Sequence, residues 1–366
     1  MAREIYILAG GGTGGHICPG IAVAEAIVRL SGDAGLVFAC SDRPIDRAFL
    51  DDLDFAIVPQ PVRPVPRSAR QMIPFYRAWR RSRRLGRRMI ADLKPSAVLG
   101  LGGFAAGPVV REARRAGIRS AMLNPDAVPG RANRYLARHV QAVFTQFEST
   151  SDALGGSCRD KIHLVGCPVR SSISSGASSS EAMNFFNLKP GLKVLLVLGG
   201  SQGAANINAA ISGLGDDLTA LAGKWQILHI AGPDQVDTFA GGGIHVTRLP
   251  FCDEMGMVYS VADLVLCRGG ASTIGELLSG NNPAVIMPYP YHRDKQQYQN
   301  ARSLTESGAA EICEDYKDRE LNIRALRDIL LPIMKDDSLL GSMQSAAKEC
   351  GNSNAAEEVA RWMIGH

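Results

Sequence analysis

Four glycine-rich turns recur along this chain, and each follows a short apolar run and precedes a segment with helical spacing of its apolar residues. Strands that alternate with helices in this way are typical of parallel α/β sheets. A glycine-rich turn lets the backbone bend sharply and approach a phosphate closely, and the helix that follows offers free N–H groups. The four turns comprise residues 10–16, 102–108, 199–203 and 268–273. The pattern therefore predicts an α/β protein that binds ligands at the carboxyl ends of its strands.

The alternation restarts after residue 198, which predicts two similar halves. A length of 366 residues fits two domains, because single cores stop growing near about 250–300 residues. We expect two Rossmann-like domains facing across a cleft, an N-terminal one over 1–165 and a C-terminal one over 181–366. The Ser- and Gly-rich stretch 166–180 is typical of a linker. A last helix near 354–364 can pack back on the N-terminal domain.

We expect seven strands in the first half of the chain and six in the second. They cover 4–9, 35–40, 55–58, 97–101, 120–123, 142–145, 162–165, 193–198, 225–230, 244–248, 264–267, 284–288 and 310–313. The clearest expected helices cover 19–31, 44–50, 72–90, 107–116, 204–213, 272–279 and 295–306.

The first turn leaves its ligand open. It contains a G-x-G-x-x-G match, but the second strand, 35–40, ends without the acidic residue that would bind a dinucleotide ribose. A plain tight turn, a nicotinamide dinucleotide and another diphosphate ligand are the three alternatives, and the sequence favours the last. Two such turns in each half suggest two phosphorylated ligands.

Composition excludes several classes of protein. The net charge of +4 is nearly balanced and gives no reason to expect nucleic acid as a partner. Eight cysteines without a C-x-x-C pair, several of them inside apolar runs, predict reduced thiols in the cytoplasm. We expect no metal site, cofactor, signal peptide or membrane-spanning segment.

A basic segment interrupts this balance. Residues 63–94 contain ten Arg and one Lys, and Asp92 is the only acidic residue among them. Arg beside aromatic residues is typical of helices that lie on anionic membranes, so Phe75, Trp79, Arg80 and Arg84 are the expected membrane contacts. A solvated charged helix and a nucleic-acid surface are the alternatives.

Seven collinear motifs give the chain a family resemblance. They read GGTGGHICPGIAVAEA (11–26), GGFAAGP (102–108), VPGRANRYLAR (128–138), VGCPVR (165–170), LGGSQGAANIN (198–208), CRGGASTIGELL (267–278) and MPYPYHRDKQQYQNA (287–301). In these motifs the chain resembles the inverting two-domain (GT-B) glycosyltransferases. Within that group it resembles the UDP-N-acetylglucosamine transferases that complete the lipid-linked disaccharide of peptidoglycan. The resemblance implies UDP-GlcNAc as the donor, an undecaprenyl-linked muropeptide as the acceptor, and a peripheral position on the cytoplasmic face of the inner membrane.

One element departs from that family. Its members carry a His-Glu-Gln-Asn run before the VPG motif, where this chain has Leu123-Asn124-Pro125-Asp126. The departure concerns the acceptor more than the donor. Imidazole titrates near neutral pH, so His16 is the first candidate for the general base and Asp126 is the second. The other expected acceptor or phosphate contacts are Thr13, Gly14, Gly15, Gly103, Phe104 and Asn133.

The expected donor site lies in the second half. A carboxylate at Glu276 can accept hydrogen bonds from both ribose hydroxyls, and Gln296 and Gln297 suit a sugar and its acetamido group. Phe251 resembles the residue that contacts uracil in the family. The diphosphate is expected at Arg170, Ser201, Gln202, Gly203, Arg268 and Ser272, close to two helix N-termini.

Three other functions remain open at this point. A glycosyltransferase of the same fold acting on another lipid is the nearest alternative. A UDP-GlcNAc epimerase shares the expected architecture but needs carboxylates around the sugar. A sugar-nucleotide binder without catalysis is the third, since the acceptor motif has changed.

Overall fold

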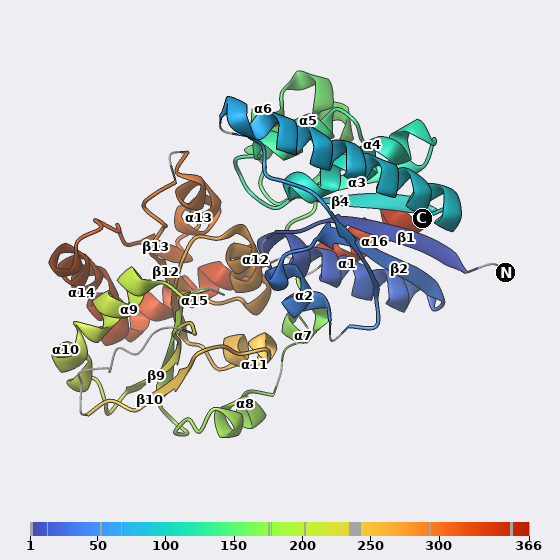
Figure 1. The fold of residues 1–366 in the computed structure, drawn as a ribbon. Helices are drawn as coiled ribbons and strands as arrows, with labels where there is room; N and C mark the ends of the chain where they lie inside the picture. The colour runs from blue at the N-terminus through green and yellow to red at the C-terminus, as the bar shows by residue number, and fades with distance from the viewer. Residues whose placement is uncertain are drawn as a thin grey trace. The chain divides into compact units, whose positions relative to one another are not determined.

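The computed structural model describes residues 3–12, 14–51, 53–66, 68–174, 176, 178–200, 203–233, 243–292, 294–351 and 354–365. The chain divides into two compact units (Figure 1). Unit 1 is Met1–Arg170 with Ser353–His366, and unit 2 is Ser171–Asn352. Each unit is built on one parallel sheet with helices packed against it, so the predicted fold of two Rossmann-like α/β domains is confirmed.

Unit 1 contains a seven-stranded sheet in the order β3-β2-β1-β4-β5-β6-β7, with all neighbours parallel. Its strands are β1 (Glu4–Gly10), β2 (Ala34–Ser41), β3 (Ala56–Gln60), β4 (Ala97–Gly102), β5 (Arg119–Asn124), β6 (Ala142–Thr145) and β7 (Ile162–Leu164). Its helices are α1 (Gly14–Ser31), α2 (Pro44–Leu50), α3 (Met72–Leu93), α4 (Gly103–Arg115), α5 (Arg131–Ala137), α6 (Thr150–Leu154) and α16 (Ala355–Ile364), with short 3₁₀ turns at Ala69–Gln71 and Gly156–Lys161.

Side-chain alternation along the strands builds the two cores of unit 1. Tyr6 and Leu8 of β1 pack with α1 and α16 on one face. Ile7 and Ala9 pack with α3, α4 and α5 on the other. Successive residues of a strand point to opposite faces, so a sheet covered on both sides has an apolar sequence throughout. This explains why β1 reads as an unbroken apolar run.

Unit 2 contains a six-stranded parallel sheet in the order β10-β9-β8-β11-β12-β13. Its strands are β8 (Lys193–Leu198), β9 (Trp225–Ile230), β10 (Val246–Leu249), β11 (Leu264–Cys267), β12 (Ala284–Ile286) and β13 (Ala310–Ile312). Its helices are α7 (Ser171–Ser174), α8 (Ser179–Phe185), α9 (Ala205–Ser212), α10 (Gly215–Thr219), α11 (Met255–Ser260), α12 (Ala271–Gly280), α13 (Gln296–Glu306), α14 (Arg319–Lys335) and α15 (Asp337–Cys350).

The domain limits differ from the expected ones in two places. The expected linker 166–180 contains α7 and the start of α8, and the division between the units falls at Arg170 and Ser171. The last helix, α16, lies in the expected range 181–366 of the C-terminal domain, and it packs back on α1 in unit 1, which is the alternative that the sequence left open (Figure 1). Val359 and Met363 are buried in the core there, so apolar burial holds the helix in unit 1.

Two helices also begin earlier than the sequence suggested. α1 starts at Gly14 and carries Pro19 inside it, and α4 starts at Gly103 directly after β4. His16 therefore lies in the first turn of a helix rather than in a loop. None of the helices in the described ranges is long and apolar enough to cross a membrane.

Candidate active site

The first glycine-rich turn of unit 1 is held by a buried carboxylate. Asp46, at the start of α2, is fully buried and accepts hydrogen bonds from Gly12 N at 2.7 Å and from Ser41 N at 3.0 Å. Gly11 and Gly12 have positive φ angles, which favour glycine. Sequence reasoning missed Asp46 because its partners at the turn lie 34 residues away.

The His16 ring lies against the second glycine-rich turn. A Cβ placed on Gly102 would lie 2.8 Å from Cδ2 of His16 and 3.1 Å from Oδ1 of Asn133. The ring approaches this closely because Gly102 and Gly103 carry no side chain, and both also have positive φ angles. Residues 16, 102, 103 and 133, which come from three separate motifs, therefore meet at one place.

Burial of His16 favours its neutral form, which is the form that can act as a base. Burial lowers the pKa of His16 below its usual value, although the carboxylates of Asp126 and Asp46 act in the opposite direction. A lowered pKa keeps the imidazole neutral near pH 7, and a neutral imidazole can accept a proton. Both base candidates from the sequence, His16 and Asp126, thus interact electrostatically in unit 1.

Asn124, in the segment 123–126 where the chain departs from the family, takes part in two side-chain hydrogen bonds. Asn133 Nδ2 donates to Asn124 Oδ1 at 2.8 Å, and Asn124 Nδ2 donates to the Asp126 carbonyl at 2.6 Å. Asn133 is 5% exposed, and its Oδ1 is buried without a partner among the described residues. A buried polar atom without a partner is costly unless a ligand or water satisfies it, so this oxygen marks a place for a donor group.

The remaining predicted residues of unit 1 have varied positions. Gly14 and Gly15 lie in the first turn of α1, and Phe104 lies under the guanidinium of Arg43, whose Cζ is 5.3 Å from the ring centre. Thr13 lies outside the described residues. Arg170, at the end of unit 1, is half-buried, and its Nε is buried without a partner in the described part of the chain.

Glu276 in unit 2 is oriented by a tyrosine. The Tyr259 hydroxyl donates to Glu276 Oε2 at 2.8 Å. Burial raises the pKa of Tyr259 well above its usual value, and the Glu276 carboxylate acts in the same direction. The phenol therefore remains protonated and acts as a donor. Glu276 is half-buried in α12, two turns after the glycine pair that opens this helix.

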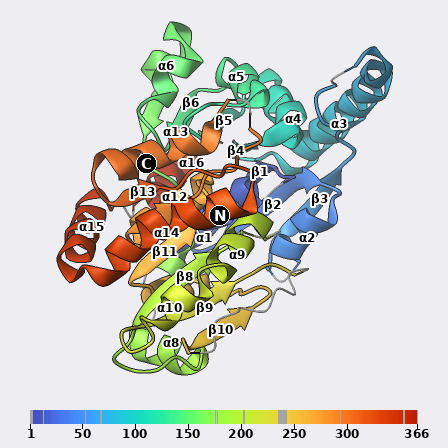
Figure 2. The same ribbon diagram turned by 90° about the vertical axis from the view of Figure 1, so that its left-hand side faces the viewer.

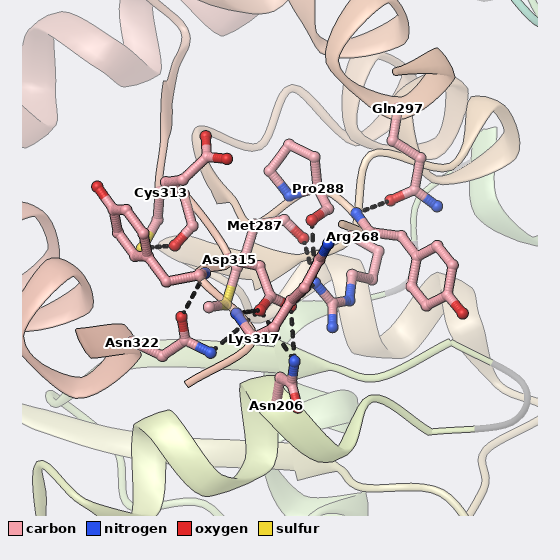
Figure 3. Close-up of polar contacts among 12 residues, drawn as sticks. Asn206, Arg268, Met287, Pro288, Gln297, Cys313, Asp315, Lys317 and Asn322 are labelled. Carbon is pink, nitrogen blue, oxygen red and sulfur yellow. Dashed lines mark hydrogen bonds and ion pairs between the residues drawn. The ribbon is translucent and has the colours of Figure 1, made fainter. Parts of the chain in front are cut away.

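Arg268 is engaged within its own unit (Figure 3). Its Nη1 donates to Asp315 Oδ2 at 2.8 Å and to the carbonyls of Met287 and Pro288 at 2.9 and 3.2 Å. The sequence favoured Arg268 as a diphosphate ligand, and any such contact has to use Nε or Nη2. Arg268 thus ties the end of β11 to the loop after β12.

Asp315 is the centre of that network and was not expected. Its fully buried carboxylate also accepts from Asn206 Nδ2 at 2.9 and 3.0 Å and from Asn322 Nδ2 at 3.1 Å (Figure 3). Burial raises its pKa, but the hydrogen bonds from Lys317 N and the Arg268 guanidinium outweigh burial and hold the pKa below its usual value. A buried carboxylate without these donors would be strongly destabilising.

The two glutamines differ from each other. Gln297 Oε1 accepts from Tyr289 N at 2.7 Å and from Gly269 N at 3.2 Å, so its carbonyl closes the turn after β11. Only an oxygen can accept both bonds, which leaves its Nε2 as the group that can meet a ligand. The Gln297 carbonyl is therefore engaged within the protein, and its role toward a sugar stays a prediction. Gln296 is half-buried beside it.

The other predicted donor residues are placed as follows. Phe251 is 51% exposed, so it is not a core residue. Gly203 has a positive φ angle in the turn that precedes α9, and Ser272 lies in the first turn of α12. Ser201 and Gln202 lie outside the described residues. No group of His, Cys, Asp and Glu within the described ranges has the geometry of a metal site.

The basic helix α3 packs along α4 (Figure 2). Arg83 and Arg87 donate to the buried carboxylate of Glu112 on α4. Arg80 and Arg84 are exposed, as expected. Arg63, Arg77 and Arg81 line a cavity of about 460 Å³. The arginines therefore divide into a paired set that fixes the helix and a set that faces a cavity or solvent.

The apolar residues of α3 differ from the expectation. Trp79 stacks on Phe75 and contacts Tyr135 of α5 edge-on, and a Cβ on Gly107 would lie 2.9 Å from its ring. Both expected aromatic contacts, Phe75 and Trp79, are half-buried because α4 and α5 offer apolar surface to them. The exposed apolar side chains are instead those of Met72, Ile73 and Tyr76, at 53%, 65% and 58%.

Comparison with known proteins gives matches along the whole chain. The glycosyltransferase family 28 N-terminal domain matches residues 6–145, and the family 28 C-terminal domain matches residues 194–359. A protein of Syntrophus aciditrophicus is 33% identical over 96% of both chains. It is named UDP-N-acetylglucosamine--N-acetylmuramyl-(pentapeptide) pyrophosphoryl-undecaprenol N-acetylglucosamine transferase.

Solved structures show the same likeness. The crystal structure of MurG from Acinetobacter baumannii matches with a TM-score of 0.75 and 26% identity, covering 100% of both chains. A putative UDP-N-acetylglucosamine 2-epimerase from Listeria monocytogenes matches with a TM-score of 0.67 at 10% identity, covering 100% of this chain and 97% of that one. At that identity the second match concerns the fold alone.

Proposed function

The chain belongs to glycosyltransferase family 28, and on this premise we propose that it transfers N-acetylglucosamine from UDP-GlcNAc to undecaprenyl-diphospho-N-acetylmuramoyl-pentapeptide. The sugar goes to the 4-hydroxyl of the acceptor and UDP is released, as a step of peptidoglycan synthesis. The observation that carries the proposal is the full-length likeness to a transferase of that name, at 33% identity over 96% of both chains.

We propose a single in-line displacement at the anomeric carbon. His16 takes the proton of the acceptor hydroxyl, the hydroxyl oxygen bonds to the anomeric carbon, and the bond from that carbon to the UDP oxygen breaks. The configuration therefore inverts. The lowered pKa of His16 supports this role, because a base has to be neutral before it can accept a proton. The unpartnered Asn133 Oδ1 next to the ring supports binding of an acceptor hydroxyl there.

The donor contacts are proposed for residues of unit 2. Glu276 accepts hydrogen bonds from the ribose hydroxyls, Phe251 contacts the uracil, and Gln296 reads the sugar. Gln297 contributes only its Nε2 group, because its carbonyl closes the turn. The N-termini of α9 and α12 offset the charge that develops on UDP as it leaves.

We also propose that α3 docks the protein on an anionic membrane. Arg63, Arg77 and Arg81 around their cavity offer charge to lipid phosphates, and Met72, Ile73 and Tyr76 offer exposed apolar surface nearby on the same helix. This arrangement suits a lipid-linked acceptor and a peripheral position on the cytoplasmic face of the membrane. Arg80 and Arg84 add charge on the same helix.

The choice of acceptor lipid tests the proposal, because the segment 123–126, where the chain departs from the family, is expected to concern the acceptor. The full-length protein is incubated with radiolabelled UDP-GlcNAc and either the muramoyl-pentapeptide lipid or a matched lipid whose muramoyl 4-hydroxyl is replaced by hydrogen. Label is expected in the first lipid alone. Label in both lipids contradicts the 4-hydroxyl as acceptor. Label in neither, with an epimerised UDP-sugar as product, favours an epimerase.

A further inference from the structure

We infer that Tyr259 is a positioning residue of the donor site, whose hydroxyl holds the Glu276 carboxylate in the orientation that receives the ribose hydroxyls. The inference rests on the role proposed for Glu276 and extends it to a residue on a different helix. No motif used in the sequence reasoning includes Tyr259.

The contact is buried and specific. Tyr259 lies in α11 and is 3% exposed, and its hydroxyl meets Glu276 Oε2 of α12 at 2.8 Å. A hydrogen bond from a neutral donor to a carboxylate is stronger than one between neutral groups. Because it engages one carboxylate oxygen from the protein interior, it limits the rotation of the Glu276 side chain.

The backbone of Tyr259 is fixed as well. Asn282 is 4% exposed, and its Nδ2 donates to the carbonyl of Tyr259 at 3.1 Å and to that of Ala262 at 3.0 Å. Asn282 follows the end of α12, so it anchors the end of α11 to the end of α12. The backbone that carries the phenol is therefore fixed, and a residue that positions another side chain needs such a fixed backbone.

The protonation states of two groups near Glu276 also suit a contact between its carboxylate and ribose hydroxyls. The phenol of Tyr259 stays protonated, and burial raises the pKa of the Cys267 thiol to about 12, with Glu276 adding to the rise. Tyr259 and Cys267 therefore stand beside the carboxylate as neutral groups. A carboxylate in such surroundings keeps its capacity to accept hydrogen bonds from neutral hydroxyls such as those of ribose.

A purely structural role for Tyr259 would also produce this geometry, so the test must depend on the ribose. Calorimetric titration compares UDP with 2′,3′-dideoxyuridine diphosphate, which lacks both hydroxyls. The proteins are wild type, Tyr259→Phe, Glu276→Ala and the double variant, all full length. Tyr6→Phe is the matched control, since Tyr6 is also buried and its hydroxyl also donates to a carboxylate, that of Glu4 in unit 1.

Tyr259→Phe is expected to weaken UDP binding roughly tenfold, as for loss of one hydrogen bond to a charged group, and to leave the dideoxy analogue unchanged. The double variant is expected to bind UDP no more weakly than Glu276→Ala, and Tyr6→Phe to bind like wild type. The ratio of the two affinities within each variant is insensitive to a general loss of stability, so a destabilised variant remains informative.

Two results overturn the inference while leaving the donor site intact. One is unchanged UDP affinity in Tyr259→Phe when Glu276→Ala binds UDP weakly. The other is an equal loss for UDP and for the dideoxy analogue. If Glu276→Ala itself binds UDP normally, the proposed ribose contact fails and the inference fails with it.

Discussion

At the scale of single residues, the environment of His16 decides its chemistry. Two glycines without side chains admit the ring, burial favours its neutral form, and two carboxylates oppose burial. The balance of these influences lowers the pKa of His16 from about 6.5, the usual value for histidine. The neutral form that burial favours fits the role of general base proposed for this residue.

The first prediction concerns this base. His16→Ala is expected to lower kcat by roughly 10²–10⁴-fold, the usual share of a general base, with unchanged UDP affinity. In wild type, kcat/KM should fall as the pH drops through the lowered pKa of His16. Because the Asp126 carboxylate raises that pKa, Asp126→Asn should move the acid limb of the profile to lower pH. A limb that moves to higher pH, or a near-normal kcat in His16→Ala, contradicts the assignment.

The second prediction separates the two glutamines. Gln296→Ala should lower turnover of UDP-GlcNAc without changing UDP affinity or the melting temperature. Gln297→Ala should also destabilise the protein by about 1–3 kcal/mol, because it leaves the N–H groups of Gly269 and Tyr289 without their acceptor. Thermal melting and calorimetry with UDP measure both effects. Identical melting temperatures for the two variants would show that the carbonyl of Gln297 is dispensable.

The sequence motifs identify the residues that are expected to contact a ligand, but they do not identify the residues that hold these side chains in position. Glu276, His16 and Asn133 belong to motifs, and a motif indicates a residue that meets a ligand. Asp46, Asp315 and Tyr259 each have a hydrogen-bond partner 17 to 109 residues away, and such pairs form only when the chain folds. The motif that contains Gln297 likewise does not show that its carbonyl accepts from the N–H groups of Gly269 and Tyr289.

At the scale of elements, the residues of α3 divide into two sets. Arg83, Arg87 and Trp79 attach the helix to α4 and α5, and its exposed residues carry the proposed membrane contact. The sequence predicted the helix and its basic character correctly. It could not show which aromatic residues face inward, because that depends on Gly107 and Tyr135 of the neighbouring helices.

The third prediction follows from this division. Vesicle co-sedimentation at low and high salt should show weaker binding to anionic vesicles for Met72→Ser/Ile73→Ser at both salt concentrations, because salt does not screen apolar burial. Arg80→Ser/Arg84→Ser should weaken binding at low salt above all. Leu321→Ser/Leu339→Ser, which changes two exposed apolar residues of unit 2, serves as the control. Equal binding by all variants would remove α3 from the membrane contact.

The fourth prediction concerns the contact between β9 and α9. His229 is buried and its Nε2 lies 2.9 Å from Asn208 Oδ1. Burial lowers its pKa to about 4, and Arg248 acts in the same direction. The unfolded chain therefore binds more protons between pH 6.5 and 4, so the free energy of unfolding should fall by up to about 3 kcal/mol as the pH drops through that window. Denaturant unfolding at several pH values should show a smaller fall in the free energy of unfolding for His229→Gln than for wild type. An equal pH dependence in the two proteins would contradict the assignment to His229.

At the scale of the whole molecule, the chain forms two α/β units, each with one parallel sheet. The short apolar runs in the sequence predicted all the strands of these sheets. The place of α16 could not be settled in this way. Its apolar spacing fits any apolar surface, and only the packing of Val359 and Met363 assigns it to unit 1.

The central claim is that the chain moves N-acetylglucosamine from UDP to a lipid. The most direct test measures, in one reaction of the full-length protein with UDP-GlcNAc and the muramoyl-pentapeptide lipid, both the UDP released and the N-acetylglucosamine recovered in lipid. Equal amounts of the two and a β-linked product are expected, because a single displacement inverts the α-linked donor. UDP released without sugar in the lipid, an epimerised UDP-sugar, or an α-linked product would contradict it.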